Sequence, residues 1–268
     1  MVNTTLEEVV SRVQELRRRH GPAAFVTSHN ALAHVDRLDD VVRGVHHWLE
    51  DDGVFVLEVG YFVDVFQKLQ FDTIYHEHLD YHTVAPFERL FTRTGMELLD
   101  VQRVEPQGGS IRVMAQKAGG RFRRDGSAGA LVALENSLGL DSPATLTRFG
   151  ERIAALGRQL RSLLCSLKAE GKSIAGFGAP TKATTLLSHF RIGSGTLDFV
   201  VDDNPLKQGK YLPASHIPIL PTAALYERRP DCLLILAWNF AEPIMVAHRR
   251  FAEAGGRFIL PMPEPRMV

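Results

Sequence analysis

Short apolar runs alternate with amphipathic segments through the second half of the chain, and this alternation restricts the fold more than any other feature. The runs SIAGFGA, LDFVVDDN, CLLILAWN and RFILPMP each have the length of one strand. The segments TKATTLLSHF and AEPIMVAHRRFAEAG have the apolar spacing of helices. Because strands that alternate with helices form parallel, doubly wound sheets, this half predicts an α/β domain.

The first half predicts a second α/β block that ends in an antiparallel hairpin. The expected elements are strands over 23–30 and 54–61, helices over 39–53 and 85–95, and a hairpin over 96–118. The Gly- and charge-rich stretch 119–130 predicts a linker, and a long amphipathic helix is expected over 143–170. We therefore expect two domains, residues 1–120 and residues 121–268.

Composition argues against several classes of protein. Lys+Arg and Asp+Glu both number 31 in 268 residues, so the formal net charge is zero and a nucleic-acid partner is not expected. No apolar run approaches the roughly 20 residues of a membrane span, and the N-terminal segment lacks the apolar core of a signal peptide. The two cysteines, Cys165 and Cys232, suggest neither a disulfide framework nor a cysteine zinc site. We therefore expect a cytoplasmic protein.

The stretch QFDTIYHEHLDYHTV, residues 70–84, concentrates proton-carrying groups, and three explanations compete for it. The groups are Tyr75, His76, Glu77, His78, Tyr81 and His82. The first explanation is a metal site, because His76 and His78 would share a face on a strand and His78 and His82 on a helix. However, no third ligand stands at a recognisable spacing. The second explanation is a polar loop whose histidines are merely solvated.

Acid–base chemistry is the third explanation, and the residue types favour it. A histidine titrates near neutrality, and a flanking carboxylate can fix its tautomer or raise its basicity. Neighbouring tyrosine hydroxyls could polarise a carbonyl group or hold an enolate oxygen. This combination suits the removal of a proton next to a ketone.

A second group of polar residues, SHNALAHV at 28–35, follows a predicted strand. Open α/β sheets bind ligands at the carboxyl ends of their strands, so either His29 or His34 could face the same cleft as His78. From spacing alone, a histidine that makes only a local hydrogen bond at a helix start is an equal alternative.

The segment GFGAPTKATTLL places a Gly-x-Gly turn, Gly176 to Gly178, between a strand and a helix. Backbone N–H groups at a helix N-terminus accept a phosphate well, and Lys182 adds a positive charge. Thr181 stands where the third glycine of the GxGxxG pattern would be, so the pattern is incomplete. Asp202 ends the next strand about 26 residues after Gly176, where a dinucleotide fold places its ribose-binding acid. A plain Asn-Pro turn is the alternative explanation of that segment.

Together these motifs resemble those of the sugar C-methyltransferase family. The stretches that carry the resemblance are QFDTIYHEHLDYHTVAPFERLF, GGSIRV, GFGAPTKATTLL, DDNPLKQGKYLPASHIPIL, LILAWN and PMPEPRMV. Enzymes of this family use S-adenosylmethionine (SAM) to methylate C3 of nucleotide-linked 4-keto deoxysugars. The resemblance implies an incomplete class I methyltransferase (Rossmann-like) domain, followed by a second Rossmann-like domain that binds the nucleotide-sugar.

The resemblance also implies roles for particular residues. His78 is the base that removes the C3 proton, Tyr75 and Glu77 support it, and His34 rather than His29 reaches the same site. The enolate then takes the methyl group of SAM, with Asn30 as a cofactor contact. The implied contacts of the nucleotide-sugar, which is expected to be dTDP-linked, are Gly178, Pro180, Lys182, Asn204, Lys207 and Gln208.

The sequence departs from the family pattern in two ways. The N-terminal cysteine-rich zinc module and the glycine-rich SAM loop have no counterpart, so zinc is not expected. We expect a truncated or split form that needs the missing SAM-binding part in cis, or from a protein partner in trans. In addition, Asp203 stands where relatives usually carry a basic residue. Two alternatives remain open: a SAM-independent C3 epimerase or isomerase, and a non-catalytic nucleotide-sugar-binding partner.

Overall fold

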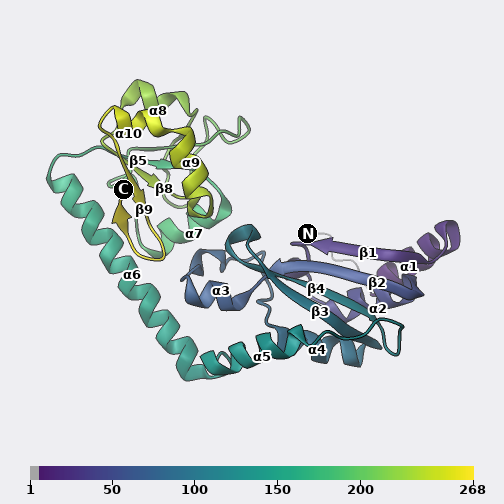
Figure 1. The fold of residues 1–268 in the computed structure, drawn as a ribbon. Coiled ribbons are helices and arrows are strands. Elements are labelled where there is room, and N and C mark those ends of the chain that lie inside the picture. The colour runs from purple at the N-terminus through teal and green to yellow at the C-terminus, as the bar shows by residue number, and fades with distance from the viewer. Residues whose placement is uncertain (1–5) are drawn as a thin grey trace. The chain divides into compact units, whose positions relative to one another are not determined.

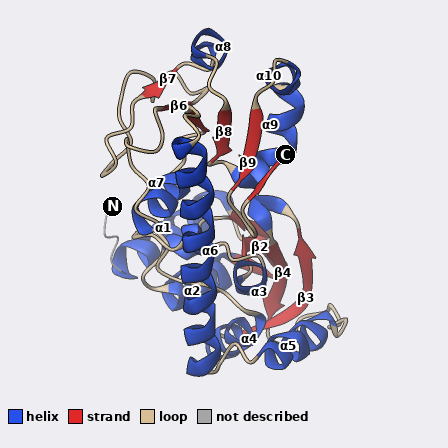
Figure 2. Ribbon diagram, turned by 90° about the vertical axis from the view of Figure 1, so that its left-hand side faces the viewer, coloured by secondary structure: helices blue, strands red, loops and turns tan. Residues whose placement is uncertain are grey.

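The computed structural model describes residues 6–268, which form two compact units (Figure 1). Unit 1 contains the described residues up to 65 together with 76–145, and unit 2 contains 66–75 and 146–268. Figure 2 shows that each unit combines helices with a sheet. The predicted α/β fold class is therefore confirmed, and both sheets contain parallel strand pairs.

Unit 1 is built on a four-stranded mixed sheet. Its strands are β1 Ala23–His29, β2 Leu49–Gly60, β3 Met96–Val104 and β4 Ser110–Lys117. The order across the sheet is β1-β2-β4-β3, with β1 parallel to β2 and the other two pairs antiparallel. The hairpin expected over 96–118 is confirmed, and it turns through the short 3-10 helix η3 (Pro106–Gly108). Strand β1 lies at one edge of the sheet.

Helices cover the apolar side of this sheet. The helices in this part of the chain are α1 Leu6–His20, η1 Leu32–His34, α2 Leu38–Trp48, α3 Phe62–Gln67, α4 Val84–Arg93 and α5 Ser127–Leu138. Helix α4 buries Val84, Phe87 and Phe91, whose spacing places them on one side of a helix. They join β2 and β4 side chains such as Leu57 and Val113 in a single core, which fixes α4 directly after the histidine-rich stretch.

The helix expected over 39–53 is wrong at its end. Helix α2 stops at Trp48, and the following residues from Leu49 onwards belong to β2. Gly53 explains why the chain can turn there: a Cβ atom at this position would lie 2.8 Å from the carbonyl oxygen of Ala23 on β1. The pairing of β1 and β2 also shifts its register next to Ala23. The close strand approach, rather than helix termination, is what the glycine serves.

The linker expected over 119–130 is also partly wrong, because α5 begins inside it. Ala128 is buried in the core of unit 1, and the Ser127 hydroxyl accepts a hydrogen bond from the Val101 backbone N–H at 2.8 Å. Unit 1 consequently extends to residue 145, a division that differs from the one expected at residue 120. A Gly- and charge-rich sequence hid a helix that is held in place by tertiary packing.

Unit 2 is built on a six-stranded sheet. Its strands are β5 Ile174–Phe177, β6 Phe199–Val201, β7 Ile219–Leu220, β8 Cys232–Ile235, β9 Arg257–Leu260 and β10 Arg266–Met267. The order is β10-β9-β8-β5-β6-β7, and every adjacent pair is parallel except β9 with β10. The central strands β5 and β8 are buried at every position, as expected for parallel strands covered on both faces. The predicted doubly wound parallel sheet is confirmed.

Seven helical segments complete this part of the chain. They are η2 Phe71–Thr73, α6 Pro143–Ala169, α7 Thr181–His189, α8 Ala223–Arg228, η4 Trp238–Phe240, α9 Ala241–Ala247 and α10 Arg249–Glu253. The long helix expected over 143–170 is α6. Gly157 on α6 allows the ring of Phe190, directly after α7, to pack against it, because a Cβ atom there would lie 2.5 Å from that ring. Thus α6 packs closely on the end of α7.

The strand order of unit 2 identifies where a ligand is expected. The chain passes from β5 to β6 on one side, whereas β8 and β9 lie on the other side of β5. The strand order therefore reverses between β5 and β8. In open α/β sheets, ligands bind outside the carboxyl ends of the strands at this reversal. The loops that follow β5 and β8 are consequently the first place to look for a binding site.

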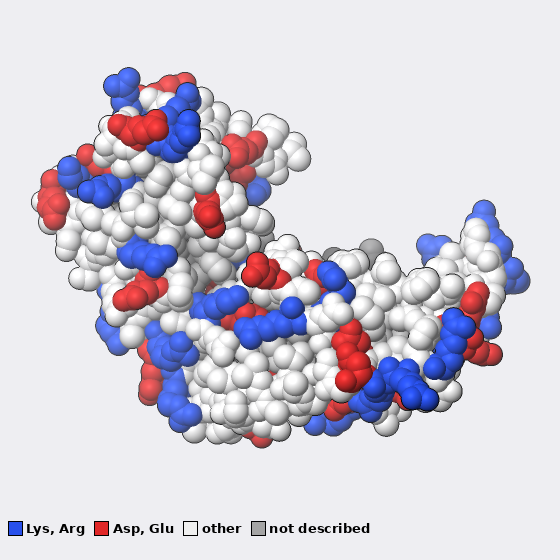
Figure 3. All heavy atoms as spheres, in the orientation of Figure 1, with Lys and Arg blue, Asp and Glu red and all other residues white. Residues whose placement is uncertain are grey.

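Three further observations concern the charged surface, the helices and the cysteines. Figure 3 shows basic residues distributed among acidic ones on the face in view, as expected for a net charge of zero. No helix within residues 6–268 is long and apolar enough to cross a membrane. Cys165 is exposed and Cys232 is buried, and both are free thiols.

Candidate functional site

The histidine-rich stretch of unit 1 is a loop, neither a strand nor a helix. Residues 76–81 run without regular structure to His82, which forms a bridge pairing with Tyr61, and α4 begins at Val84. The backbone N–H of Leu79 donates a hydrogen bond to the Ala33 carbonyl at 2.7 Å, which ties the loop to η1. The shared faces on a regular strand or helix that motivated the metal explanation therefore do not exist.

His34 is the upstream histidine that reaches this loop. Its Nδ1 lies 2.8 Å from the carbonyl oxygen of Glu77. Because a carbonyl oxygen only accepts hydrogen bonds, Nδ1 must carry the proton, so the neutral imidazole has its lone pair on Nε2. The contact fixes the tautomer of His34 and leaves Nε2 able to accept a proton.

Histidine and tyrosine rings gather around this contact. The ring centroids of His34 and His78 lie 5.0 Å apart, and those of His78 and Tyr81 lie 6.5 Å apart. His29 and Asn30, at the end of β1, are both exposed, and Asn30 adopts a left-handed conformation with a φ of 50°. Among the two histidines of this segment, the structure brings His34 next to His78. Asn30 as a cofactor contact stays a prediction.

Glu77 contacts His34 through its backbone carbonyl group and not through its side chain. Its carboxylate lies 4.0 Å from Nε2 of His76, and both side chains are more than half exposed. A surface pair of this kind contributes little to stability. The Glu77 carbonyl group contacts His34, and the expected support of His78 by Glu77 stays a prediction. Tyr75 is half-buried and is the last residue of the 66–75 segment of unit 2.

His82 differs from the other histidines because it is buried. Its ring stacks on Phe87 of α4 with centroids 4.9 Å apart, and its Nε2 has no hydrogen-bond partner. Burial, together with the proximity of His78, lowers the pKa of His82 to about 4, so the ring is neutral near pH 7. His82 is therefore part of the buried packing between the loop and α4.

A buried carboxylate that sequence inspection missed binds the residues on either side of the histidine-rich loop. Glu135 on α5 accepts hydrogen bonds from the Tyr61 hydroxyl at 2.9 Å and from the backbone N–H of Val84 at 2.7 Å. It also accepts a longer bond from the N–H of Ala85, so it caps the first turn of α4 from another helix. Burial and the bond to Glu135 raise the pKa of Tyr61. No local sequence signal marks Glu135, because its partners lie about 50 residues away.

No metal centre forms in the part of the chain that the structure describes. Residues 6–268 contain no group of three or more His, Cys, Asp or Glu side chains placed to hold a metal ion. The histidines of the loop are instead arranged around the His34–Glu77 contact. Their arrangement suits proton transfer.

In unit 2, the Gly-x-Gly turn follows β5 and leads into α7. Gly178 has a φ of 89°, and a Cβ atom there would lie 2.8 Å from the side chain of Ala237, so only glycine fits. The N–H of Gly178 donates to the Val201 carbonyl, and the N–H of Ala179 donates to the Asp202 carboxylate at 2.7 Å. Pro180 has no N–H. These amides of the turn are therefore already used inside the protein.

Asp202, directly after β6, binds several groups of the segment 202–208. Its carboxylate accepts a hydrogen bond from the Asn204 N–H at 2.8 Å and lies 3.3 Å from the Lys207 ammonium group. The Gln208 side chain donates to the Asp202 carbonyl at 2.9 Å. Asp202 is buried, and its carboxylate already binds the turn after β5, its own loop and Lys207. Lys207, whose side chain is 38 % exposed, remains accessible to a ligand.

A second buried carboxylate lies against the loops after β5 and β8. Asp72 of η2 is fully buried, and its Oδ2 accepts a hydrogen bond from the Trp238 indole N–H at 2.6 Å. The Lys182 ammonium group lies 5.4 Å from the centre of the Trp238 ring. Burial lowers the pKa of Lys182, and the negative charge of Asp72 opposes that effect. These side chains therefore lie at the reversal of strand order where a ligand is expected.

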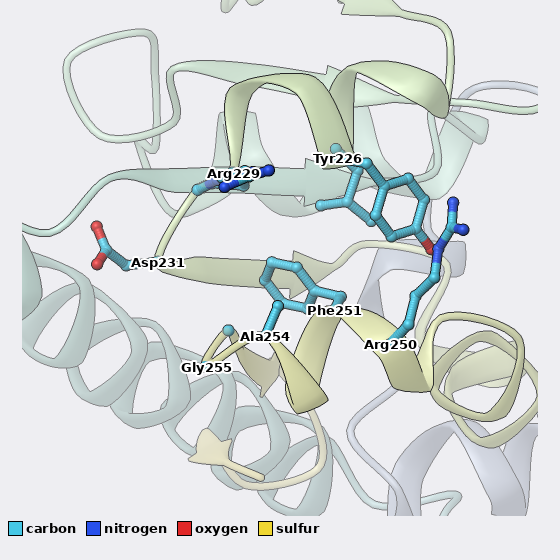
Figure 4. Close-up of a pocket in the computed structure, with 10 residues that line it drawn as sticks. Tyr226, Arg229, Asp231, Arg250, Phe251, Ala254 and Gly255 are labelled. Atoms are coloured by element: carbon cyan, nitrogen blue, oxygen red, sulfur yellow. The ribbon is translucent and has the colours of Figure 1, made fainter.

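A cavity of about 520 Å³ lies at the opposite ends of the strands of the same sheet (Figure 4). The loops before β8 and β9 line it, with Tyr226 and Arg250 on one side and Asp231 on the other. The Arg250 guanidinium packs 3.8 Å from the centre of the Tyr226 ring. Because this cavity lies at the amino ends of the strands, it is separate from the loops that carry Lys182.

Two comparisons match the chain to known proteins. Residues 105–263 match the family model described as "C-methyltransferase C-terminal domain". The chain is 38% identical over 255 residues to C-methyltransferase NovU of Streptomyces niveus. That match covers 95% of this chain and 61% of the relative, so the chain spans about three fifths of the length of that protein.

Similarities to solved structures are weaker. A protein of Listeria monocytogenes described as an S-adenosylmethionine dependent methyltransferase matches with a TM-score of 0.29 and 18% identity, over 36% of this chain and 62% of that one. The structure of M1.HpyAVI matches with a TM-score of 0.28 and 9% identity, over 42% and 53% of the two chains. Scores this low carry no argument about the function of the chain.

Proposed function

The chain belongs to the C-methyltransferase family, and from this premise we propose that it removes a proton from the carbon that is to be methylated, on a nucleotide-linked 4-keto deoxysugar. The observation that carries the proposal is the contact of His34 with Glu77 beside His78. It places two imidazoles together and leaves one of them with a defined lone pair. A methyltransferase of carbon needs such a base, because a C–H bond is not a nucleophile.

The proposed chemistry follows from the position of the proton. The C4 ketone makes the hydrogen on C3 acidic, because the carbanion is stabilised as an enolate. His78 takes this proton, and His34, with its lone pair on Nε2, lies beside it to share or relay the charge. Tyr75 is proposed to donate a hydrogen bond to the enolate oxygen. The products of this step are an enolate, whose C3 is nucleophilic, and a protonated imidazole.

Unit 2 is proposed to bind the nucleotide part of the substrate. Lys182 and Lys207 supply positive charge beside the carboxyl ends of β5 and β6, and the N-terminus of α7 adds its dipole. The turn amides of Gly178 and Ala179 are engaged internally, so Gly178 and Pro180 act by shape and the lysines by charge. A dTDP group is the proposed anion.

SAM is the methyl donor that the family implies, and it supplies an electrophilic methyl group when bound. Unit 1 fits a SAM site only in part. Its described residues contain no Gly-x-Gly turn that joins a strand directly to a helix, and Asn30 is the one candidate contact. Strand β1 lies at the sheet edge with Phe25 69% exposed, so we propose that further polypeptide, in cis or in trans, pairs there and completes the donor site.

Deuterium exchange tests the proton-removal step without a methyl donor. A dTDP-linked 4-keto deoxysugar incubated with the protein in D₂O is expected to gain deuterium at C3, observed by NMR. His78→Gln should lower the rate by about 10²-fold or more, the usual contribution of a general base. The matched control is His76→Gln, because His76 is the exposed histidine of the same loop and should leave the rate unchanged.

Two further outcomes separate the proposal from its alternatives. Exchange that is equal in the wild type and His78→Gln would contradict the role of His78. If the purified chain instead returns a C3-epimerised sugar with no methyl donor present, it is an isomerase. Calorimetry with thymidine diphosphate and, separately, with SAM should give binding of the nucleotide and little binding of SAM.

A further inference from the structure

The segment 66–75 is a part of unit 2 that lies, in the sequence, between two stretches of unit 1. Two of its aromatic side chains pack into unit 2, one at the first residue of the segment and one near its middle. The Phe66 ring lies 5.5 Å from that of Phe149 on α6, and the Phe71 ring lies 4.7 Å from that of Phe190. The segment ends at Tyr75, and His76 of the histidine-rich loop follows directly. Its attachment therefore determines where the chain leaves unit 2.

Asp72 is the polar centre of this attachment. It is fully buried, although an aspartate is rarely buried without an ionic partner. One oxygen, Oδ2, accepts the Trp238 indole N–H at 2.6 Å, and the other, Oδ1, has no hydrogen-bond partner. The Lys182 charge acts on the same carboxylate. A merely structural carboxylate would more often have both oxygens satisfied.

Trp238 and Lys182 belong to the two loops that flank the expected ligand site. Trp238 follows β8, and Lys182 lies in the first turn of α7, after β5. The Lys182 ammonium group also lies over the Trp238 ring. Asp72 therefore contacts or influences both sides of the strand-order reversal, while its own segment carries Tyr75 three residues further along the chain.

We propose that Asp72 is a positioning residue that shares Lys182 with the anionic ligand of unit 2 and thereby couples ligand binding to the placement of the 66–75 segment. The inference rests on the proposed function, because it takes Lys182 as a contact of the nucleotide diphosphate. It adds a role for Asp72 and Trp238, neither of which is assigned to the substrate.

Charge explains the direction of the coupling. A desolvated ammonium group needs anionic neighbours, and among the described residues of the free protein Asp72 acts on Lys182 in this way. A bound diphosphate supplies a second anion and holds Lys182 in place from the ligand side. Lys182 held in this way keeps its charge and its position over Trp238, so the indole N–H stays directed at Asp72. The segment 66–75 is thereby made more rigid when the nucleotide is bound.

Hydrogen–deuterium exchange of backbone amides, read by mass spectrometry, tests the coupling without an activity assay. In the free protein, Asp72→Ala is expected to speed exchange in 66–75 by about tenfold or more, while α6 stays unchanged. Thymidine diphosphate should slow exchange in this segment of the wild type. It should fail to do so in Asp72→Asn, which keeps the size of the side chain and an acceptor oxygen but removes the charge.

Asp72→Asn separates a charge effect from simple packing. If the segment of this variant is protected by thymidine diphosphate as strongly as that of the wild type, Asp72 acts only by shape and the proposal is overturned. The same holds if the nucleotide binds the wild type and leaves 66–75 unprotected. The control is Glu242→Gln, an exposed carboxylate on α9 that should behave as the wild type.

Two measurements keep this test apart from the test of the proposed function. Calorimetry should show that Asp72→Asn changes the Kd for thymidine diphosphate by less than about threefold, while C3 exchange into the sugar falls about tenfold. If the wild type does not bind the nucleotide at all, the function proposed for unit 2 is contradicted and the ligand coupling falls with it. The comparison of free wild type with free Asp72→Ala still decides whether Asp72 anchors the segment.

Discussion

The imidazole rings of His34 and His78 lie 5.0 Å apart, between centroids, although 44 positions separate them in the sequence. The approach depends on backbone contacts. His34 donates from Nδ1 to the Glu77 carbonyl, and the Leu79 N–H donates to the Ala33 carbonyl. Two segments from different places in the chain are thus joined next to the proposed base, which makes His34 testable separately from His78.

Replacing His34 should impair proton removal. His34→Ala deletes the ring beside His78 and the contact with Glu77, so C3 exchange is expected to fall by about 10-fold to 100-fold. His29→Ala is the control, because His29 is exposed at the end of the preceding strand. Exchange rates measured by NMR in D₂O should separate the two variants; an equal effect of both would rule out the specific role of His34.

Removing the buried carboxylate of Glu135 should destabilise unit 1. Glu135→Ala leaves the Tyr61 hydroxyl and the N–H groups of Val84 and Ala85 without their acceptor, at a cost of about 3 kcal/mol in the free energy of unfolding. Tyr61→Phe removes one of these bonds and should cost about 1 kcal/mol. Urea unfolding measures both, and Glu151→Ala, at an exposed position of α6, should remain within about 0.5 kcal/mol of the wild type.

Two glycines should respond to alanine in opposite directions. Gly109 has a φ of 138°, and an added Cβ atom would overlap the Asp64 carboxylate, which pairs with Arg103 at 2.8 Å. Gly109→Ala should therefore lower the stability by about 2 kcal/mol or more. Gly129, inside α5, has open space around its Cα atom, so Gly129→Ala should stabilise the protein by about 0.5–1 kcal/mol. Thermal unfolding checks both variants. A loss of stability in Gly129→Ala would contradict the placement of Gly129 in a helix with open space around it.

His82 should make the protein sensitive to mild acid. Its pKa is about 4 in the folded state because of burial, against 6.5 for the ordinary side chain. Between these values the unfolded state binds a proton that the folded state cannot, so stability falls as the pH falls from 6.5 to 4. The full loss is about 3 kcal/mol.

Replacing His82 with Phe removes the titrating group while keeping a ring on Phe87. Urea unfolding of His82→Phe at pH 7 and pH 5 is expected to show a smaller loss of stability in acid than the wild type shows. His20→Phe, at an exposed position of α1, serves as the control and should lose as much as the wild type. Equal acid sensitivity in His82→Phe and the wild type would exclude His82 as the cause.

Local patterns in the sequence determined most elements of the fold. The hairpin turning at Gln107–Gly109, the long helix α6 and the alternating strands and helices of unit 2 follow from apolar periodicity and glycine placement, which act within a few residues. Periodicity failed at Gly53 and in the stretch 119–130. In both places a contact with a distant part of unit 1 overrode the local preference.

The candidate site shows the same division. The sequence by itself determined which residue types are proposed to carry the chemistry: the histidines and tyrosine near residue 78, and the lysines after β5 and β6. Only the tertiary structure decided which of them meet, and it added Glu135 and Asp72. The Asp72–Trp238 bond joins residues 166 positions apart. Such a pair leaves no local pattern, because its stability comes from burial and from partners that the folded chain alone brings together.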